Sequence, residues 1–344
     1  MDRAASIVEY DGNLRNADPF VREPRESRGR TKYRRFGLMY EESAMTTKLT
    51  RRAMLGTIAV SGTAALPRAS AAGEATDDPN WKIAKGRIRQ SVVQWCFKPM
   101  PIEDLARHAA ALGFPSVELA PPSDWPILKK YGLSCAIAGS HGFVKGWNHK
   151  ENWDFCTESI TKAVNAAADF GCPSVITFSG MRGDLPAGAE GDEIGKRNFV
   201  EGIKRVVPLA EQKKVTLALE MLNSRVDIEM KGHPGYQCDS IEWAVDVCKR
   251  VGSERLKILF DIYHVQIMQG DVIVRLKKYK DYIAHYHTAG NPGRNEIDET
   301  QEINYPGIMQ AILATGYKGF VGQEFIPTRD KVRSLNEAVK ICDV

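Results

Sequence analysis

The chain has 344 residues with 47 basic and 43 acidic side chains, and 43% of its residues are hydrophobic. This composition supports a large buried core and excludes an intrinsically disordered protein. The net charge of +4 comes from one end, because residues 1–71 carry 13 basic and 8 acidic side chains, whereas the remaining 273 residues carry 34 and 35. The body is therefore neutral, and we expect no nucleic-acid partner, since binding to phosphate backbones requires a basic surface.

The N-terminal 71 residues have the features of a leader. Residues 1–44 are polar and lack apolar periodicity. We therefore expect either that they are disordered or that they result from a start codon assigned too far upstream, with Met45 as the true start. After Met45 come Arg51-Arg52, a weakly apolar run over 53–66 and small residues at 69–71. This order is typical of a twin-arginine signal peptide over 45–71, which predicts recognition by the Tat export machinery and a periplasmic mature protein.

The apolar run of the leader is shorter than the roughly 20 residues that cross a bilayer, and no later stretch is apolar enough, so we expect no stable membrane span. Residues 72–86 are interpreted as a linker. The seven cysteines form no C-x-x-C pair, which argues against a zinc knuckle and a disulfide framework. We expect free structural thiols.

From residue 87 to 344, β-branched runs alternate with segments of helical period. Strands are predicted over 88–95, 116–120, 133–139, 174–179, 215–220, 256–261, 282–288 and 318–324. Helices are predicted over 102–112, 152–170, 193–213, 239–251, 271–279, 305–315 and 330–342. Eight βα repeats in one domain predict the α/β class and a closed (β/α)8 TIM barrel. The alternative, a doubly wound open sheet, lacks a G-x-G-x-x-G motif after the first strand.

Charged residues end four consecutive predicted strands, and barrel enzymes carry their chemistry at the C-terminal ends of the strands. Glu220, Asp261 and Glu324 are the last residues of three of these strands, and His287 lies near the end of the fourth. Such groups are costly to bury unless they are paired or bind a metal. Three carboxylates and one imidazole suit one divalent metal ion, Mn²⁺ or Mg²⁺, with Co²⁺ or Zn²⁺ as alternatives.

The stretches LALEMLN, LFDIYHVQ, AHYHTAGNPGRNE, EINYP and GFVGQEF carry a family resemblance. The region from Arg87 to the C-terminus resembles hydroxypyruvate isomerase-like members of the xylose isomerase-type barrel superfamily, which also includes ketose 3-epimerases. The resemblance implies an isomerase or epimerase that moves a proton through an enediolate on a keto or hydroxy sugar or a small keto-acid substrate. It implies that Glu220 and Glu324 form the acid/base pair and that His264 and Arg294 contact substrate oxygens.

The loop after Glu220 departs from the ketose epimerases, in which a second acidic residue follows six positions later. Val226 occupies that position here, and Asp227 is the substitute that we expect to bind substrate after a one-residue insertion. Glu118 and His141, after the second and third predicted strands, are further candidates for substrate binding, with a structural hydrogen-bonding role as the alternative. His285 lies two residues before His287 and is interpreted as a core histidine one layer deeper.

Two other functions remain open at this level. The same metal and base would serve an eliminase or lyase that cleaves keto-glycosides, and a barrel that has lost turnover would serve as a sugar-binding protein. The residues do not separate isomerisation from epimerisation or elimination, and they leave the oligomeric state open. The carboxylate pair favours an enzyme.

Overall fold

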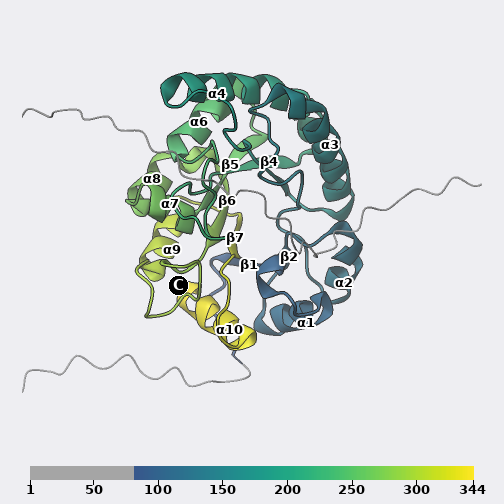
Figure 1. Cartoon of the computed structure of the whole chain (residues 1–344). Coiled ribbons are helices and arrows are strands. Elements are labelled where there is room, and N and C mark those ends of the chain that lie inside the picture. The colour runs from purple at the N-terminus through teal and green to yellow at the C-terminus, as the bar shows by residue number, and fades with distance from the viewer. Residues whose placement is uncertain (1–80) are drawn as a thin grey trace, which may run out of the picture. The chain divides into compact units, whose positions relative to one another are not determined.

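The computed structural model describes residues 81–344 (Figure 1). The expected disordered segment 1–44, the twin-arginine signal peptide 45–71 and most of the linker 72–86 lie outside the described residues. The cysteine prediction is confirmed, since all seven cysteines are free and buried. None of the helices in the described part of the chain is both long enough and apolar enough to cross a membrane.

The described chain alternates strands and helices, as the sequence predicts. The strands are β1 (Arg89–Val93), β2 (Ser116–Glu118), β3 (Ser174–Thr177), β4 (Thr216–Glu220), β5 (Leu256–Asp261), β6 (Ile283–Thr288) and β7 (Phe320–Gln323). The helices are α1 (Ile102–Leu112), α2 (Trp125–Lys130), α3 (Trp153–Phe170), α4 (Ala189–Ile203), α5 (Val207–Lys213), α6 (Ile241–Val251), α7 (Ile262–Met268), α8 (Val272–Lys278), α9 (Tyr305–Ala314) and α10 (Lys331–Cys342).

All the strands are parallel and pair in the order β2-β1-β7-β6-β5-β4-β3. In Figure 1 the strands lie at the centre and the helices surround them. This arrangement places the C-terminal ends of the strands around one mouth. Helices α1, α3 and α6 end at Gly113, Gly171 and Gly252, which have positive φ, and the chain turns sharply there from each helix towards the next strand.

The predicted third strand, 133–139, closes the barrel without forming a regular strand. It bridges β2 through Ser134 and β3 through Ala138. The hydrogen bonds explain the irregularity, because Val117 N donates to Ser134 O but Leu119 N donates to Ile137 O rather than to the residue two positions on. The segment thus contains one extra residue, as in a β-bulge. The eightfold closure supports the (β/α)8 TIM barrel, in a single domain for the described residues.

The structure corrects the predicted helices in extent and in number. The single helix predicted over 193–213 is wrong in extent, because α4 ends at Ile203 and α5 begins at Val207. Pro208 explains the break, since its ring would collide with the carbonyl of residue 204 in a continuous helix. The sequence pattern also fails to predict two short helices, α2 and α7. Helix α7 follows β5 without a loop and carries His264.

Candidate active site

A cavity of about 230 Å³ opens at the C-terminal ends of the strands. Its floor is charged, with Glu220, Arg294 and Glu324 among the lining residues. Its walls are mainly apolar. The wall residues are Trp95, Leu119, Gly139, Ser140, Gly142, Phe143, Ile176, Phe178, Leu222, Met230 and His233.

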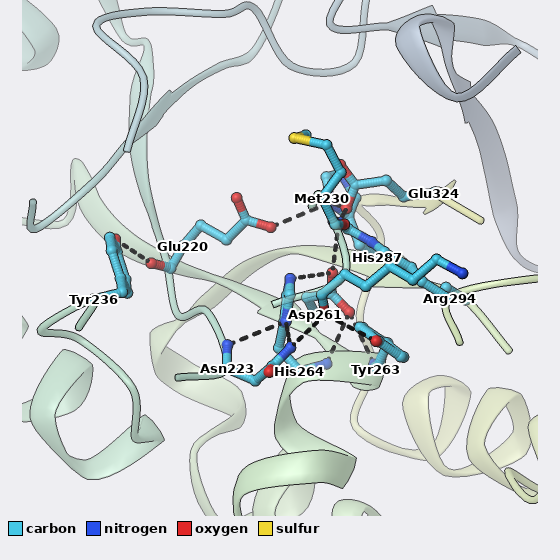
Figure 2. Close-up of polar contacts among 12 residues, drawn as sticks. Glu220, Asn223, Met230, Tyr236, Asp261, Tyr263, His264, His287, Arg294 and Glu324 are labelled. Carbon is cyan, nitrogen blue, oxygen red and sulfur yellow. Dashed lines mark hydrogen bonds and ion pairs between the residues drawn. The ribbon is translucent and has the colours of Figure 1, made fainter. Parts of the chain in front are cut away.

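The four residues predicted from the strand ends meet beside this cavity. Glu220 is the last residue of β4, Asp261 ends β5, His287 lies in β6, and Glu324 directly follows β7. One ligand-type atom from each lies within 4.8 Å of the others, and all four side chains are buried. Figure 2 shows them converging from neighbouring strands. The structure therefore assembles the group that the sequence predicts.

Asp261 divides its two oxygens between the fold and the site. Oδ1 caps α7 by accepting hydrogen bonds from the backbone N–H groups of Tyr263 (2.8 Å) and His264 (3.3 Å). Oδ2 faces Arg294 Nη2 at 3.4 Å and His264 Nε2 at 3.6 Å. The cap thus fixes the carboxylate with one oxygen directed at the site.

The surroundings of His264 determine its tautomer. Its Nδ1 lies 3.1 Å from the backbone nitrogen of Asn223, which can only donate, so Nδ1 accepts. Burial, with the nearby Arg294 charge, holds the pKa of His264 well below its usual value. The ring is therefore neutral with its proton on Nε2, and this N–H has no hydrogen-bond partner among the described residues. A ligand oxygen near Asp261 would supply that partner.

The two ring nitrogens of His287 contact different groups, one the buried Glu118 and the other the carboxylates of the site. Its Nε2 lies 3.1 Å from Oε1 of Glu118. Its Nδ1 lies 2.8 Å from Oε2 of Glu324 and 3.7 Å from Oε1 of Glu220. Burial favours the neutral ring, but these carboxylates, Glu324 first, raise the pKa of His287 well above its usual value.

Arg294 places a guanidinium in the same cluster. Nη2 lies 2.5 Å from Oε2 of Glu324 and 3.4 Å from Oδ2 of Asp261, and Nη1 donates to the carbonyl of Met230 at 2.7 Å. The residue has a φ of 56°, which is uncommon for a side chain other than glycine, and it is fully buried. The ring of Trp95 lies 5.3 Å from the guanidinium.

The carboxylates differ in their electrostatics. Burial, together with the charges of Glu324 and Glu220, raises the pKa of Asp261 to about 7, although Arg294 opposes the shift. Burial and the Glu324 charge also raise the pKa of Glu220. Burial alone would raise the pKa of Glu324, but Arg294 and His287 hold it well below its usual value. Without a ligand, the site therefore favours the ionised form of Glu324 and disfavours the ionised forms of Asp261 and Glu220.

These residues fit a divalent cation. Buried polar atoms without a hydrogen-bond partner are rare in folded proteins. In the described chain they include Glu220 Oε1, His264 Nε2 and Arg294 Nε. Three clustered carboxylates with one imidazole nitrogen are a donor set for hard divalent cations, and a cation would relieve the repulsion that raises the pKa of Asp261 and Glu220.

Of the five predicted substrate-binding residues, Arg294 lines the cavity, whereas Glu118, His141, Asp227 and the buried His264 do not. Glu118 is fully buried beneath it and contacts His285 and His287. Both ring nitrogens of His141 are engaged, Nδ1 with the carbonyl of Lys145 and Nε2 with Thr177 Oγ1. Asp227 lies exposed on the loop after β4. His285 is buried and paired, as expected for a core histidine.

Most of the apolar wall comes from residues that the sequence pattern does not single out. Phe143 and Phe178 lie on loops after the irregular segment and β3, and their rings are 6.4 Å apart. His233 and Met230 come from the long loop after β4, and the His233 ring lies 4.3 Å from that of Phe143. This loop, which the sequence marks as unusual, supplies His233 and Met230 to the wall instead of the acidic Asp227.

The comparisons with known proteins agree with this architecture. Residues 106–341 match the family model described as xylose isomerase-like TIM barrel. The chain is 30% identical to a 2-oxo-tetronate isomerase from Cupriavidus necator, over 60% of this chain and 70% of that protein. It is 29% identical to a hydroxypyruvate isomerase from Escherichia coli, over 64% and 85%. A solved 3-keto-D-glucoside 4-epimerase from E. coli superposes with a TM-score of 0.60 at 17% identity, over 74% and 97%.

Proposed function

The chain belongs to the xylose isomerase-like TIM barrel family, and on that premise we propose that it is an isomerase that transfers a proton on a small hydroxy-keto substrate. One observation carries the proposal. Two glutamates, Glu220 and Glu324, line the same cavity from different strands, and both belong to the buried group that suits a divalent cation.

Isomerisation requires a base that removes a weakly acidic C–H proton and an acid that returns it to the neighbouring carbon. Glu220 and Glu324 are the two carboxylates among the cavity-lining residues of the described chain, so they are the groups that accept and return the proton. The unpartnered Oε1 of Glu220 is free to accept it. Ion pairs with Arg294 and His287 keep Glu324 ionised before the reaction, so it is able to accept a proton, and the same partners place positive charge near the substrate oxygens.

We propose that Glu220, Asp261, His287 and Glu324 hold one divalent metal ion. Such an ion would stabilise the negative charge that develops on the substrate oxygens as the enediolate forms. The neutral His264 would donate its Nε2–H to a substrate oxygen. The apolar walls around Phe143 and Phe178 exclude water, which strengthens each of these electrostatic contacts.

The substrate class follows from the relatives and from Arg294. Hydroxypyruvate and 2-oxo-tetronate, which the relatives' names specify, are hydroxy-keto acids. Arg294 is the one arginine or lysine among the residues that line the cavity in the described chain, and a guanidinium suits a carboxylate or a pair of hydroxyl oxygens. We therefore propose a small keto acid or keto sugar as the substrate.

The experiment is a screen of the Mn²⁺-loaded protein against hydroxypyruvate, 2-oxo-tetronate, keto sugars and keto-glycosides in D₂O. We expect deuterium to enter the carbon beside the carbonyl, with the carbonyl moved to the neighbouring carbon in the product. Return of the proton to the same carbon would identify an epimerase, and release of a β-substituent would identify a lyase. No exchange with any substrate that binds would leave a sugar-binding barrel and reject the isomerase.

We also propose that residues 45–71 direct export of the folded protein to the periplasm by the twin-arginine route. The proposal rests on the order of Arg51-Arg52, the apolar run and the small residues in the sequence. Replacing both arginines by lysine is expected to retain the protein in the cytoplasm. Unchanged export of this variant, or an exported protein that retains Met45, would reject it.

A further inference from the structure

One buried carboxylate near the site has no role in the chemistry described so far. Glu118 ends β2 and is fully buried, and it does not line the cavity. Its carboxylate lies 3.1 Å from Nε2 of His287 and 3.1 Å from Nε2 of His285. In the sheet, β1 and β7 separate β2 from β6, so the Glu118 side chain reaches across the barrel interior to meet the two histidines.

Gly322 on β7 makes this reach feasible. A Cβ atom at this position would lie 1.7 Å from Oε1 of Glu118 and 2.9 Å from Cδ2 of His287. Side chains other than glycine would therefore displace the carboxylate from the imidazole. Gly322 pairs in register with His287 of β6 on one side and with Ser91 of β1 on the other, which places the gap between β1 and the histidine. The absence of a side chain at Gly322 thus leaves space for the Glu118 carboxylate.

The contact has a chemical consequence for His287. An ionised carboxylate only accepts hydrogen bonds, so Nε2 of His287 carries the proton that it donates to Glu118. The other nitrogen, Nδ1, is then the atom directed at Glu324 and Glu220. A hydrogen bond of this kind fixes the tautomer and the ring orientation of a metal-binding histidine and makes it more basic.

We propose that Glu118 is a positioning residue that presents Nδ1 of His287 to the divalent cation, with His285 holding the carboxylate and Gly322 providing its space. This inference rests on the proposed metal site. The proposal gives the buried Glu118–His285 pair a function. The sequence alone suggested substrate contact for Glu118 and a packing role for His285.

The first experiment needs no substitution. In the ¹⁵N-histidine-labelled protein saturated with Zn²⁺, a diamagnetic probe, long-range ¹H–¹⁵N NMR spectra report which nitrogen of His287 carries the proton. We expect protonated Nε2 and metal-bound Nδ1. A proton on Nδ1 with Nε2 bound to Zn²⁺ would overturn the proposal, whereas a wild-type protein that binds no metal would reject the proposed function itself.

The second experiment measures the dissociation constant of Mn²⁺ by calorimetry. Loss of such an outer contact typically weakens metal binding by about 10- to 100-fold. We expect Glu118→Ala to reach the upper part of this range, Glu118→Gln the lower part because its amide oxygen still accepts a hydrogen bond, and Gly322→Ala to weaken binding as well. Turnover of all three should recover as Mn²⁺ is raised, because the substrate-facing glutamates are unchanged.

Asp343 offers a matched control. It is also a buried carboxylate, but it accepts hydrogen bonds from the backbone of Ala84, Lys85 and Gly86, outside the site. Asp343→Asn should lower thermal stability without changing the Mn²⁺ dissociation constant. If Glu118→Ala and Gly322→Ala bind Mn²⁺ as tightly as the wild type, or if Asp343→Asn weakens binding equally, Glu118 is only a structural residue.

Discussion

The two halves of the barrel contribute different chemistry to one cavity. Strands β4 to β7 each end in or next to a charged residue of the candidate metal group. The other half, formed by β1, β2, the bulged segment 133–139 and β3, supplies apolar wall residues such as Trp95, Phe143 and Phe178. On the proposed function, the charged half would carry the chemistry and the apolar half would select and enclose the substrate.

The largest effect is expected from removing a ligand in the charged half. Asp261→Ala and His287→Ala should lose most of the bound metal and nearly all turnover, as measured by elemental analysis and steady-state kinetics. Asp261→Ala also removes the cap of α7, which typically costs about 1 kcal/mol. Asp261→Asn retains a capping oxygen and therefore separates the two effects. Full metal occupancy in both alanine variants would contradict the site.

A smaller loss is expected when the proton-transfer groups are changed but the shape is kept. Glu220→Gln and Glu324→Gln should lower kcat by about 10²- to 10⁴-fold even at saturating Mn²⁺, because an amide does not accept the proton. One of the variants should still exchange substrate hydrogen with D₂O if each glutamate serves a different carbon. Near-normal kcat for both at saturating substrate would reject the proton-transfer mechanism.

The difference between the charged and the apolar half also explains how much of the fold and of the site could be predicted from the sequence. Strands β4 to β7 are consecutive in the chain and adjacent in the sheet, so acidic residues at their ends had to converge once a parallel barrel was inferred. The role of Glu118 could not be seen in this way, because its contact with His287 depends on the missing side chain at Gly322. The walls come from loops, whose paths have no periodicity that a sequence pattern could reveal.

Arg294 connects the charged cluster to the substrate, and its loss should affect binding more than chemistry. Arg294→Ala is expected to raise KM by about 10- to 100-fold, as for loss of hydrogen bonds to a charged group. Because the guanidinium holds the pKa of Glu324 low, its removal should also move the acid limb of the pH–rate profile to higher pH. Arg294→Lys keeps the charge but loses the planar fork. An unchanged KM in both variants would exclude Arg294 from substrate binding.

The apolar half should respond through substrate preference. Phe143→Ala is expected to change KM by on the order of 10-fold or less, and to change the ratio of kcat/KM between short and long substrates, with kcat at saturation nearly kept. Phe155 provides the control, since it is 45% exposed and does not line the cavity. If Phe143→Ala and Phe155→Ala behave alike in substrate preference, the wall does not select the substrate.

The smallest effect should come from a buried carboxylate that is already paired. Glu296 accepts hydrogen bonds from Thr328 N, Thr328 Oγ1 and Arg329 N. Burial acts to raise the pKa of Glu296, but these bonds lower it below 4.5. Its stabilisation is therefore present above the unfolded pKa and is lost as the pH falls through the folded pKa.

Glu296→Gln should lower the free energy of unfolding at pH 7 by about 1–3 kcal/mol and flatten the acid side of the stability curve, while Mn²⁺ affinity stays unchanged. Glu299→Gln, at an exposed neighbouring position, should have little effect on any of these quantities. An equal change in stability for both variants would show that the hydrogen bonds of Glu296 contribute nothing.

The central claim is that the charged half of the barrel holds one divalent cation among Glu220, Asp261, His287 and Glu324. The most direct test is a crystal structure grown with Mn²⁺ and measured at a wavelength that reveals its anomalous scattering. We expect one strong anomalous peak per chain, in contact with the three carboxylates and Nδ1 of His287. A peak instead among Glu118, His285 and His287, which also form a buried cluster of ligand-type groups, or no peak at saturating Mn²⁺, would contradict it.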